Sequence, residues 1–276
     1  TVTCVEQHQC FGGMQNKYTH YSKVLKCEMT FSLFLPSNQT MKKIPLIWWL
    51  SGLTCTDDNF SQKSGFQRLA EQHQVAVIVP DTSPRGEDVA DDDAYDLGKG
   101  AGFYVNATQK PWSEHYQMYT YIVDELKEIA HTLVPHFSGE ESIMGHSMGG
   151  HGALVIGMKN PTRFKAISAF APILCPSQAP WGIKAFTAYL GEDQTSWKAW
   201  DAAELVKEVN IPPILIMQGT QDNFYPKHLD ETLFLENAKQ HNHSLLYEKM
   251  EGYDHSYFFI STFLEDHFDF HMKYLR

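Results

Sequence analysis

Hydrophobic residues occur in short runs that are separated by polar segments. Two runs are continuous, at residues 44–50 and 75–79, and such runs are typical of strands that are buried on both faces of a parallel sheet. The intervening residues 64–74 place apolar side chains on one face at helical spacing. This first part of the chain is therefore predicted to fold as strand, helix, strand.

The same alternation continues along the rest of the chain. An earlier strand is predicted over 24–35, where apolar side chains alternate from Met29 until Pro36 ends the run. Further strands are predicted at residues 142–144, 165–170, 213–218 and 245–250. Further helices are predicted at residues 116–133 and 149–159, within 224–241, and at 256–275. This order predicts an α/β fold with a mainly parallel central sheet, helices on both faces, and ligand chemistry at the carboxyl ends of the strands.

One domain is expected over residues 1–276, because a chain of this length fits one large α/β domain and no internal repeat or linker divides it. Only residues 175–198 interrupt the alternation of strands and helices. This segment contains prolines, tryptophans and several glycines or serines. We expect it to form a small excursion over the site.

Composition and charge narrow the classes of function. The chain is 43% hydrophobic and 20% charged, as in folded globular proteins, and its formal charge of -11 argues against binding to a nucleic-acid duplex. No segment approaches the roughly 20 apolar residues of a membrane span, and residues 1–9 lack the features of a signal peptide. The five cysteines form no C-x-x-C pair, which favours a reducing compartment over a disulfide scaffold or a zinc site. We expect no metal, no cofactor, no nucleic-acid partner and no membrane partner.

A serine in a glycine-rich turn is the first candidate for chemistry. Residues 145–149 read G-H-S-M-G and fit the nucleophile elbow G-x-S-x-G, which requires a strand before the serine and a helix after it. Both elements are predicted here, so Ser147 is the candidate nucleophile. His146 and His151 are close in sequence, but His146 is expected to point elsewhere from the tight turn, and neither needs a catalytic role.

A serine hydroxyl needs a base to take its proton, and the base needs an acidic partner that fixes its tautomer. In this fold the acidic residue and then the histidine follow the serine in chain order. Asp222 comes after the predicted strand at 213–218, and His255 comes after the predicted strand at 245–250. We therefore predict a Ser147, Asp222 and His255 triad. Asp254 is the weaker acidic candidate because it is the direct neighbour of His255.

The oxyanion of a tetrahedral intermediate needs two backbone N–H donors, one from the residue after the nucleophile and one from an earlier loop. The first would be Met148. The second would come from residues 51–55, which follow the apolar run at 44–50.

Five longer motifs resemble the S-formylglutathione hydrolase family, also called esterase D, within the α/β-hydrolase superfamily. They are W-L-S-G-L-T-C-T at 49–56, P-D-T-S-P-R-G at 80–86, G-A-G-F-Y at 100–104, G-H-S-M-G-G-H-G-A-L at 145–154, and G-Y-D-H-S-Y at 252–257. The similarity extends to residues 180–182 and to the terminal 273–275. The sequence departs from the family at 95–98, where Trp and Phe are expected around the aspartate and the glycine, and this departure concerns local packing.

The resemblance implies a cytoplasmic, homodimeric serine thioesterase that releases formate and glutathione from S-formylglutathione in formaldehyde detoxification, with carboxylesterase activity as well. It implies the same triad, with Leu53 and Met148 as the oxyanion donors. It also implies that Cys55 lies near the site and makes the enzyme sensitive to thiol reagents.

Several alternatives stay open from the sequence alone. The chain could be a broader carboxylesterase of small acyl esters, or a non-catalytic binding module of the same fold. Trp181 could wall the acyl pocket or could simply pack. His267 and His271 are expected on a solvated helix face. Four basic side chains could balance the charge of glutathione: Lys63, Arg85, Lys99 and Lys184.

Overall fold

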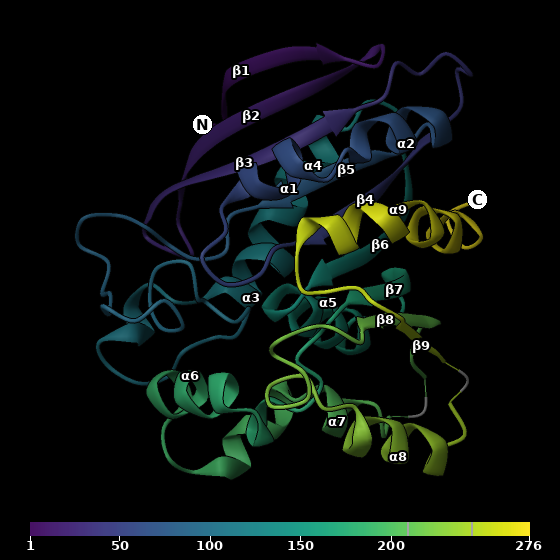
Figure 1. Cartoon of the computed structure of the whole chain (residues 1–276). Coiled ribbons are helices and arrows are strands. Elements are labelled where there is room, and N and C mark those ends of the chain that lie inside the picture. Colours follow the sequence, from purple (N-terminus) through teal and green to yellow (C-terminus); the bar gives the residue numbers. More distant parts are fainter. Residues whose placement is uncertain (209, 244) are drawn as a thin grey trace.

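A single sheet of nine strands runs through residues 1–208, 210–243 and 245–276, which are the residues that the computed structural model describes (Figure 1). The strands follow the spatial order β1-β2-β3-β5-β4-β6-β7-β8-β9. Their bounds are β1 Thr3–Cys10, β2 Gly13–Ser22, β3 Cys27–Leu35, β4 Ile44–Leu50, β5 Ala76–Pro80, β6 Phe137–His146, β7 Phe164–Phe170, β8 Ile214–Gly219 and β9 Leu246–Met250.

Most strand pairs are parallel. Each pair from β5 through β4, β6, β7 and β8 to β9 is parallel, whereas β1, β2, β3 and β5 pair with one another in antiparallel fashion. The predicted α/β fold with a mainly parallel sheet is therefore confirmed, and an antiparallel extension is added at one side. The carboxyl ends of β4, β6, β8 and β9 lie at the same edge of the parallel part.

The strand boundaries differ from the prediction where side chains are polar or exposed. β1 and β2 were not predicted, because β1 is exposed along nearly its whole length and carries mostly polar residues. β3 begins at Cys27 instead of residue 24, since Lys26 lies in a turn with a φ of 55°. β6 begins at Phe137 instead of residue 142, and its first four residues are the ones that are not buried. Hydrophobic pattern thus locates the buried part of a strand and misses the rest.

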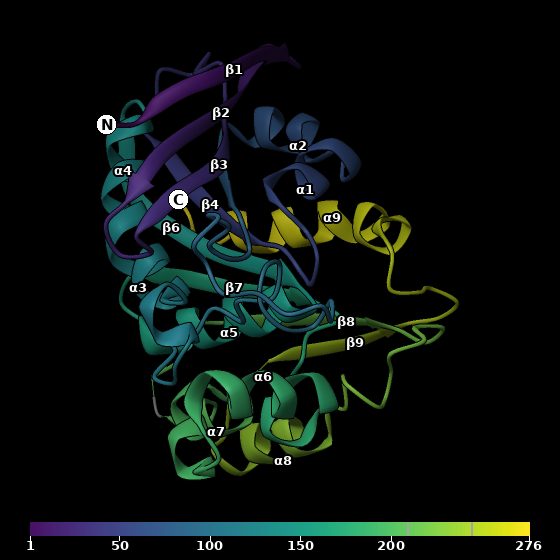
Figure 2. The same cartoon turned by 90° about the vertical axis from the view of Figure 1, so that its left-hand side faces the viewer.

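Helices cover both faces of the sheet. Figure 2 shows α1, α2 and α9 on one side of the sheet and α3, α4 and α5 on the other. The helix bounds are α1 Asp57–Lys63, α2 Phe66–His73, α3 Met118–Thr120, α4 Lys127–Leu133, α5 Met148–Lys159, α6 Pro180–Leu190, α7 Ala202–Leu205, α8 Thr232–Gln240 and α9 Tyr257–Met272. The helix predicted at 116–133 is α3 and α4 joined by a π-helical stretch, Tyr121–Leu126.

Helix α1 is missing from the prediction because Phe60 is the one large apolar residue among its seven, so no hydrophobic stripe marks it. Its start is nevertheless encoded in the sequence. Thr56 accepts a hydrogen bond from the N–H of Asp58, and Asn59 accepts one from the N–H of Thr56, which together form a capping box. Phe60 then stacks on Trp49 of β4 with ring centroids 3.8 Å apart.

The expectation of a solvated face for His267 and His271 on α9 is wrong. Both side chains are fully buried against the sheet, where Nδ1 of His267 lies 2.8 Å and Nε2 of His271 lies 2.7 Å from the Ser168 hydroxyl of β7. Burial holds the pKa of both imidazoles well below the ordinary value, to about 3 for His271. Two histidines spaced four residues apart therefore mark the inner face of α9.

The expected excursion at 175–198 contains α6 and the short 3-10 turn Pro176–Gln178, and a second 3-10 segment, Gln194–Trp200, begins within it and ends two residues beyond it. Because one sheet includes strands from both ends of the chain, we infer one domain over residues 1–276. Among the described residues, none of the helices combines the length and the apolar character that spanning a bilayer requires.

Candidate active site

Ser147 sits at the tight turn between β6 and α5. Its backbone has a φ of 59° and a ψ of -114°, a conformation that L-residues adopt only under constraint and that is typical of a nucleophile elbow. The residue is 3% exposed. The sequence-predicted strand and helix therefore meet at the serine in the expected way.

The two glycines of the motif allow the close crossing of the turn. A Cβ atom added to Gly145 would lie 2.2 Å from the carbonyl oxygen of Gly149, and one added to Gly149 would lie 1.9 Å from the carbonyl oxygen of Leu50. Neither distance leaves room for a methyl group. The spacing G-x-S-x-G is thus a steric requirement of this turn and of its packing against the end of β4.

Asp222 and His255 come together at the carboxyl ends of β8 and β9. The His255 Nδ1 atom lies 2.6 Å from the Asp222 Oδ2 atom. Asp222 is buried and also accepts hydrogen bonds from the Gln218 side chain at 3.0 Å and from the Phe224 N–H at 2.8 Å. These contacts fix the position of the carboxylate. Because the Nδ1 atom of His255 faces Asp222, the Nε2 atom on the other side of the ring is available for another partner.

The alternative residues are engaged differently. Asp254 accepts hydrogen bonds from the N–H and the hydroxyl of Ser256 at the start of α9. His151 is buried and its Nε2 lies 2.8 Å from the carbonyl oxygen of Phe103. The structure therefore brings His255 to Asp222 instead of Asp254.

His146 does not point away from the site, contrary to the expectation from the sequence. Its ring lies against His255, with centroids 4.4 Å apart, and it lines the same cavity. Burial, with a smaller contribution from His255, holds the pKa of His146 well below the ordinary value. The His146 imidazole is therefore uncharged, and it forms part of the cavity wall beside His255, the candidate base.

The loop at residues 51–55 packs directly beside the serine. A Cβ atom added to Gly52 would lie 3.4 Å from the Cβ of Ser147. Met148 is the first residue of α5, so its N–H has no acceptor within the helix. Across the described residues, neither the Leu53 N–H nor the Met148 N–H donates a hydrogen bond to another protein atom. Both groups are free for a ligand oxygen.

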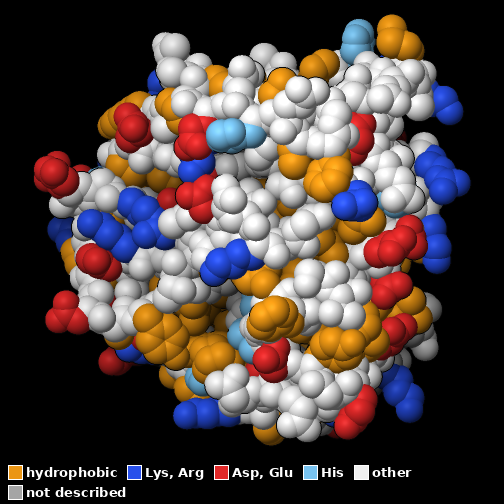
Figure 3. Space-filling model, turned by 45° about the horizontal axis from the view of Figure 1, so that its top comes forward, with side chains coloured by type: hydrophobic (Ala, Val, Ile, Leu, Met, Phe, Trp, Pro, Cys, Tyr) orange, Lys and Arg blue, Asp and Glu red, His pale blue; other side chains and the backbone are white. Residues whose placement is uncertain are grey.

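Ser147, His255 and Leu53 line a cavity of about 340 Å³, whereas Asp222 and Met148 are not among its lining residues. Figure 3 shows a hollow that contains histidine side chains and is surrounded by hydrophobic ones, in keeping with the composition of this lining. The cavity is lined by Gly52, Leu53, Thr54, Cys55, Asn59, Lys63, Tyr95, His146, Ser147, Trp181, Phe224, His255 and Tyr257.

One wall of the cavity is aromatic. Trp181 is buried at the start of α6, where its ring stacks on His228 at 3.8 Å and packs against Phe224 at 4.6 Å. The indole N–H donates a hydrogen bond of 2.7 Å to the hydroxyl of Tyr95. Trp181 therefore both packs and lines the cavity, and Tyr95, from the segment that departs from the family pattern, holds it in place.

Cys55 also lines the cavity, at the end of the loop at residues 51–55 that packs beside Ser147. All five cysteines of the chain are free thiols, and burial raises the pKa of Cys55 above its ordinary value. Cys55 is thus a neutral thiol beside the candidate nucleophile. A second cavity of about 430 Å³ contains Cys175, whose pKa burial raises to about 11, and that cavity lacks a serine with a basic partner.

Three lining residues were not singled out from the sequence. Phe224 and Tyr257 each follow a predicted triad residue by two positions, so proximity in the chain to Asp222 and His255 was the available signal. Asn59 belongs to the unpredicted helix α1. In the part of the chain that the structure describes, no group of three or more His, Cys, Asp or Glu side chains is arranged to hold a metal ion.

Comparison with known proteins shows the family to which this chain belongs. An esterase family model matches residues 22–270. A solved S-formylglutathione hydrolase from Agrobacterium tumefaciens is 46% identical, covers 99% of this chain and 100% of its own, and superposes with a TM-score of 0.96. The chain belongs to the S-formylglutathione hydrolase family. It is therefore a hydrolase, and the alternative of a non-catalytic binding module is set aside.

More distant structures share the fold. The fluorophosphonate-binding serine hydrolase F of Staphylococcus aureus is 21% identical, with a TM-score of 0.74 over 94% of this chain and 98% of its own. A ferulic acid esterase from Anaeromyces mucronatus is 20% identical, with a TM-score of 0.66 over 98% of this chain and 92% of its own.

Proposed function

We propose that this member of the S-formylglutathione hydrolase family hydrolyses S-formylglutathione to formate and glutathione through a formyl-enzyme on Ser147. The observation that carries the proposal is the arrangement around one cavity: an elbow serine, a histidine bonded to a buried aspartate, and two unpartnered backbone N–H groups. The 46% identity to the Agrobacterium tumefaciens enzyme supports the choice of substrate.

In the first half-reaction, His255 Nε2 takes the proton of the Ser147 hydroxyl while Oγ forms a bond to the formyl carbon. The carbonyl π electrons move to the oxygen, and the resulting oxyanion accepts hydrogen bonds from the N–H groups of Leu53 and Met148. Asp222 holds the imidazole in the required tautomer and stabilises the imidazolium that forms. When the oxyanion collapses, the C–S bond breaks, glutathione leaves with the electron pair of that bond, and the imidazolium of His255 gives its proton to the departing sulfur, which returns the imidazole to its neutral form. A thiolate with a pKa near about 8.5 needs little help from His255 to leave.

In the second half-reaction, water replaces glutathione beside His255. The imidazole takes a proton from the water as its oxygen attacks the formyl-ester carbon, and a second oxyanion forms at the same two N–H groups. Collapse breaks the bond between the formyl carbon and Ser147 Oγ, releases formate, and returns the proton from His255 to the serine. A formyl group requires little space in a cavity that Tyr95, Trp181 and Phe224 help to line.

The test is the hydrolysis of S-formylglutathione by purified protein, followed by loss of the thioester absorbance. Replacing Ser147 with Ala is expected to lower kcat by roughly 10⁴-fold or more. Ser142→Ala is the matched control, because Ser142 is a buried serine of β6, the strand that leads to Ser147, and its hydroxyl has no hydrogen-bond partner among the described residues. Turnover by Ser147→Ala within tenfold of the wild type would contradict the proposal.

A broader carboxylesterase acting on small acyl esters is the second candidate. The aromatic lining around Trp181 favours it, because apolar rings suit alkyl and aryl ester groups. Comparing kcat/KM for S-formylglutathione with kcat/KM for aryl acetates separates the two functions. We expect the thioester to be preferred.

We further propose a cytoplasmic homodimer that acts in formaldehyde detoxification. Five free thiols support a reducing compartment. Dimerisation and the cellular role are carried over from the family resemblance. Light scattering of the purified protein tests the oligomeric state, and formaldehyde sensitivity of cells that lack the protein tests its role.

A further inference from the structure

Recognition of glutathione requires a positive charge, because the ligand carries two carboxylates and this chain has a formal charge of -11. Four side chains were candidates from the sequence, and the structure separates them. Arg85 donates to the carboxylate of Asp81 at 2.8 Å, and Lys184 forms an ion pair with Asp96 at 2.7 Å. Lys99 lies outside the lining of the active-site cavity. Lys63 is left.

Lys63 lines the cavity and has no ion pair with any acidic side chain of the described residues. It is exposed at the end of α1, one helical turn after Asn59, which also lines the cavity. Its ammonium lies 5.9 Å from the ring centroid of Tyr257, another lining residue. The positive charge of Lys63 also opposes the burial that raises the pKa of Cys55, as expected of a cation close to that thiol.

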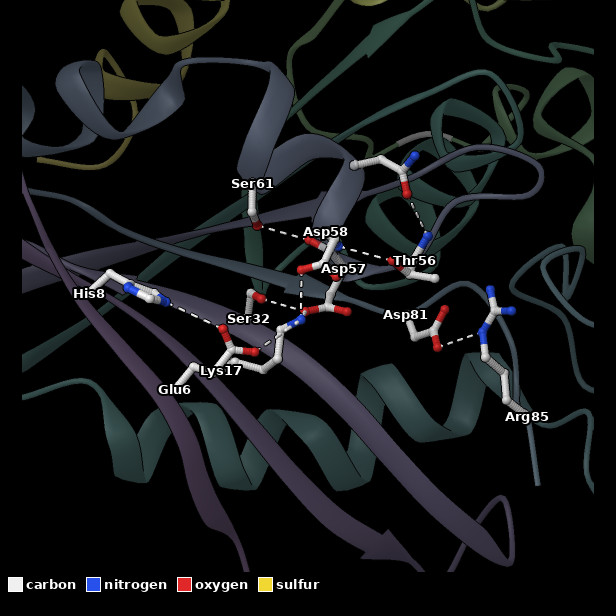
Figure 4. A network of polar contacts seen from close by, with 11 residues as sticks. Glu6, His8, Lys17, Ser32, Thr56, Asp57, Asp58, Ser61, Asp81 and Arg85 are labelled. Atoms are coloured by element: carbon white, nitrogen blue, oxygen red, sulfur yellow. Dashed lines mark hydrogen bonds and ion pairs between the residues drawn. The ribbon is translucent and has the colours of Figure 1, made fainter. Parts of the chain in front are cut away.

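Helix α1 holds Lys63 at a fixed place beside the cavity. Figure 4 shows the polar contacts that attach the start of this helix to the sheet. Lys17 of β2 reaches Asp58 at 2.7 Å and Asp57 at 3.5 Å, and the Ser32 hydroxyl of β3 donates to the buried Asp57 at 2.5 Å. These contacts attach the short helix to the sheet, so the backbone of Lys63 has a fixed position although its side chain is flexible.

The lining of the cavity consequently has two unlike parts. Asn59 and Lys63, on α1, form a polar and positively charged part, and Tyr95, Trp181 and Phe224 form an aromatic part. A row of ring contacts separates the two parts, running from Tyr257 beside Lys63 through His146 and His255 to Phe224 and Trp181. We propose that Lys63 binds a carboxylate of the glutathione moiety, so that the leaving group lies along α1 and the acyl group lies toward the aromatic wall. This inference rests on the proposed thioesterase function and adds the residue that selects the thiol part of the substrate.

The test compares charged and neutral ligands in Lys63→Gln. For S-formylglutathione, we expect KM to rise roughly five- to tenfold with little change in kcat, as for one partly exposed charge-assisted hydrogen bond. The non-hydrolysable S-methylglutathione, used as a competitive inhibitor of aryl acetate hydrolysis, is expected to lose affinity by the same factor. The neutral aryl acetate should lose far less, and Lys63→Arg should restore most of the affinity for both glutathione ligands.

Lys42→Gln is the control, because Lys42 is also an exposed lysine but precedes β4, at the opposite end from the site. Equal losses on aryl acetate and on S-formylglutathione would overturn the inference, and so would unchanged KM and inhibition in Lys63→Gln. Failure of the wild type to hydrolyse S-formylglutathione would refute the proposed function instead, and the inhibition by S-methylglutathione would still decide the role of Lys63. Absence of that inhibition in the wild type would overturn the role assigned to Lys63.

Discussion

Replacing Asp222 with Asn tests the predicted triad most directly, because it keeps the size of the side chain and removes its charge. The carboxylate contacts His255 Nδ1 at 2.6 Å and is 4% exposed, so water cannot substitute for it. An asparagine would present an amide to Nδ1, and rotation to offer its NH₂ group would favour the imidazole tautomer with the proton on Nε2. That tautomer cannot accept the proton of Ser147.

Two effects determine how far kcat is expected to fall in Asp222→Asn. Hydrogen bonds to charged groups contribute about 1.5–3 kcal/mol, which corresponds to a roughly 10- to 150-fold loss once the imidazolium forms. The unfavourable tautomer adds to this loss, and we expect a fall in kcat of roughly 10³- to 10⁴-fold, as for the same change in other serine hydrolases. The Gln218 and Phe224 hydrogen bonds to the side chain limit rearrangement, so the fold should persist.

The assay is steady-state hydrolysis of S-formylglutathione at neutral pH, with circular dichroism as the check on folding. Asp254→Asn is the matched control, since Asp254 is the sequence neighbour of His255 and, among the residues that the structure describes, its carboxylate accepts side-chain and backbone hydrogen bonds from Ser256 alone. The control is expected to retain activity within a few-fold. A folded Asp222→Asn protein with a kcat within tenfold of the wild type would refute the assignment of Asp222 as the orienting acid.

Two further predictions concern stability. Gly149→Ala should lower the free energy of unfolding by roughly 3 kcal/mol or more, because the added Cβ would lie 1.9 Å from the Leu50 carbonyl oxygen. Gly139→Ala is the control, since a Cβ there meets no atom within 4 Å. This change should lower the free energy of unfolding by only about 1 kcal/mol, because Gly139 has a positive φ. Urea unfolding measures both, and similar costs at the two glycines would contradict the steric argument. The free energy of unfolding should also fall as pH decreases below about 6.5, because His267 and His271 are buried as neutral imidazoles with a lowered pKa and the unfolded chain binds their protons first. Each can contribute up to about 1.4 kcal/mol per pH unit in that range, and a stability that stays constant between neutral pH and about pH 5.5 would refute this assignment.

The elements that sequence reasoning found are those whose physical cause is local. The elbow requires glycine on both sides of Ser147, because the chain crosses itself there and touches the end of β4. Asp222 follows the buried strand β8 and His255 follows the largely exposed strand β9, and parallel neighbouring strands bring their carboxyl ends together. A pattern of apolar runs and the residues that follow them is enough to predict such a site.

The features that were missed depend on contacts between distant segments. β1 buries almost nothing, and α1 has one large apolar side chain, so neither element produces a periodic signal. The direction of the His146 side chain depends on the strained turn at Ser147 and on where the β9 loop places His255. Lys63 could be distinguished from the other three cations only after the partners of Arg85 and Lys184 and the lining of the cavity were known. Each of these is a property of packing, which a single sequence does not contain.

Each candidate site residue is held by a different element of the fold, and this affects how the activities of variants should be interpreted. Ser147 is held by the β6 turn, Asp222 by the loop after β8 with its own hydrogen bonds, and His255 by the loop after β9. Because each loop follows its own strand, removing one side chain should leave the backbone positions of the other two unchanged. A loss of activity in one variant therefore reports the chemical role of that side chain, provided that folding is intact. Lys63 lies on α1, which is separate from the three loops that hold the triad and is attached to the sheet by its own contacts. Loss of the Lys63 side chain should therefore change the affinity for glutathione and leave the geometry of the triad unchanged.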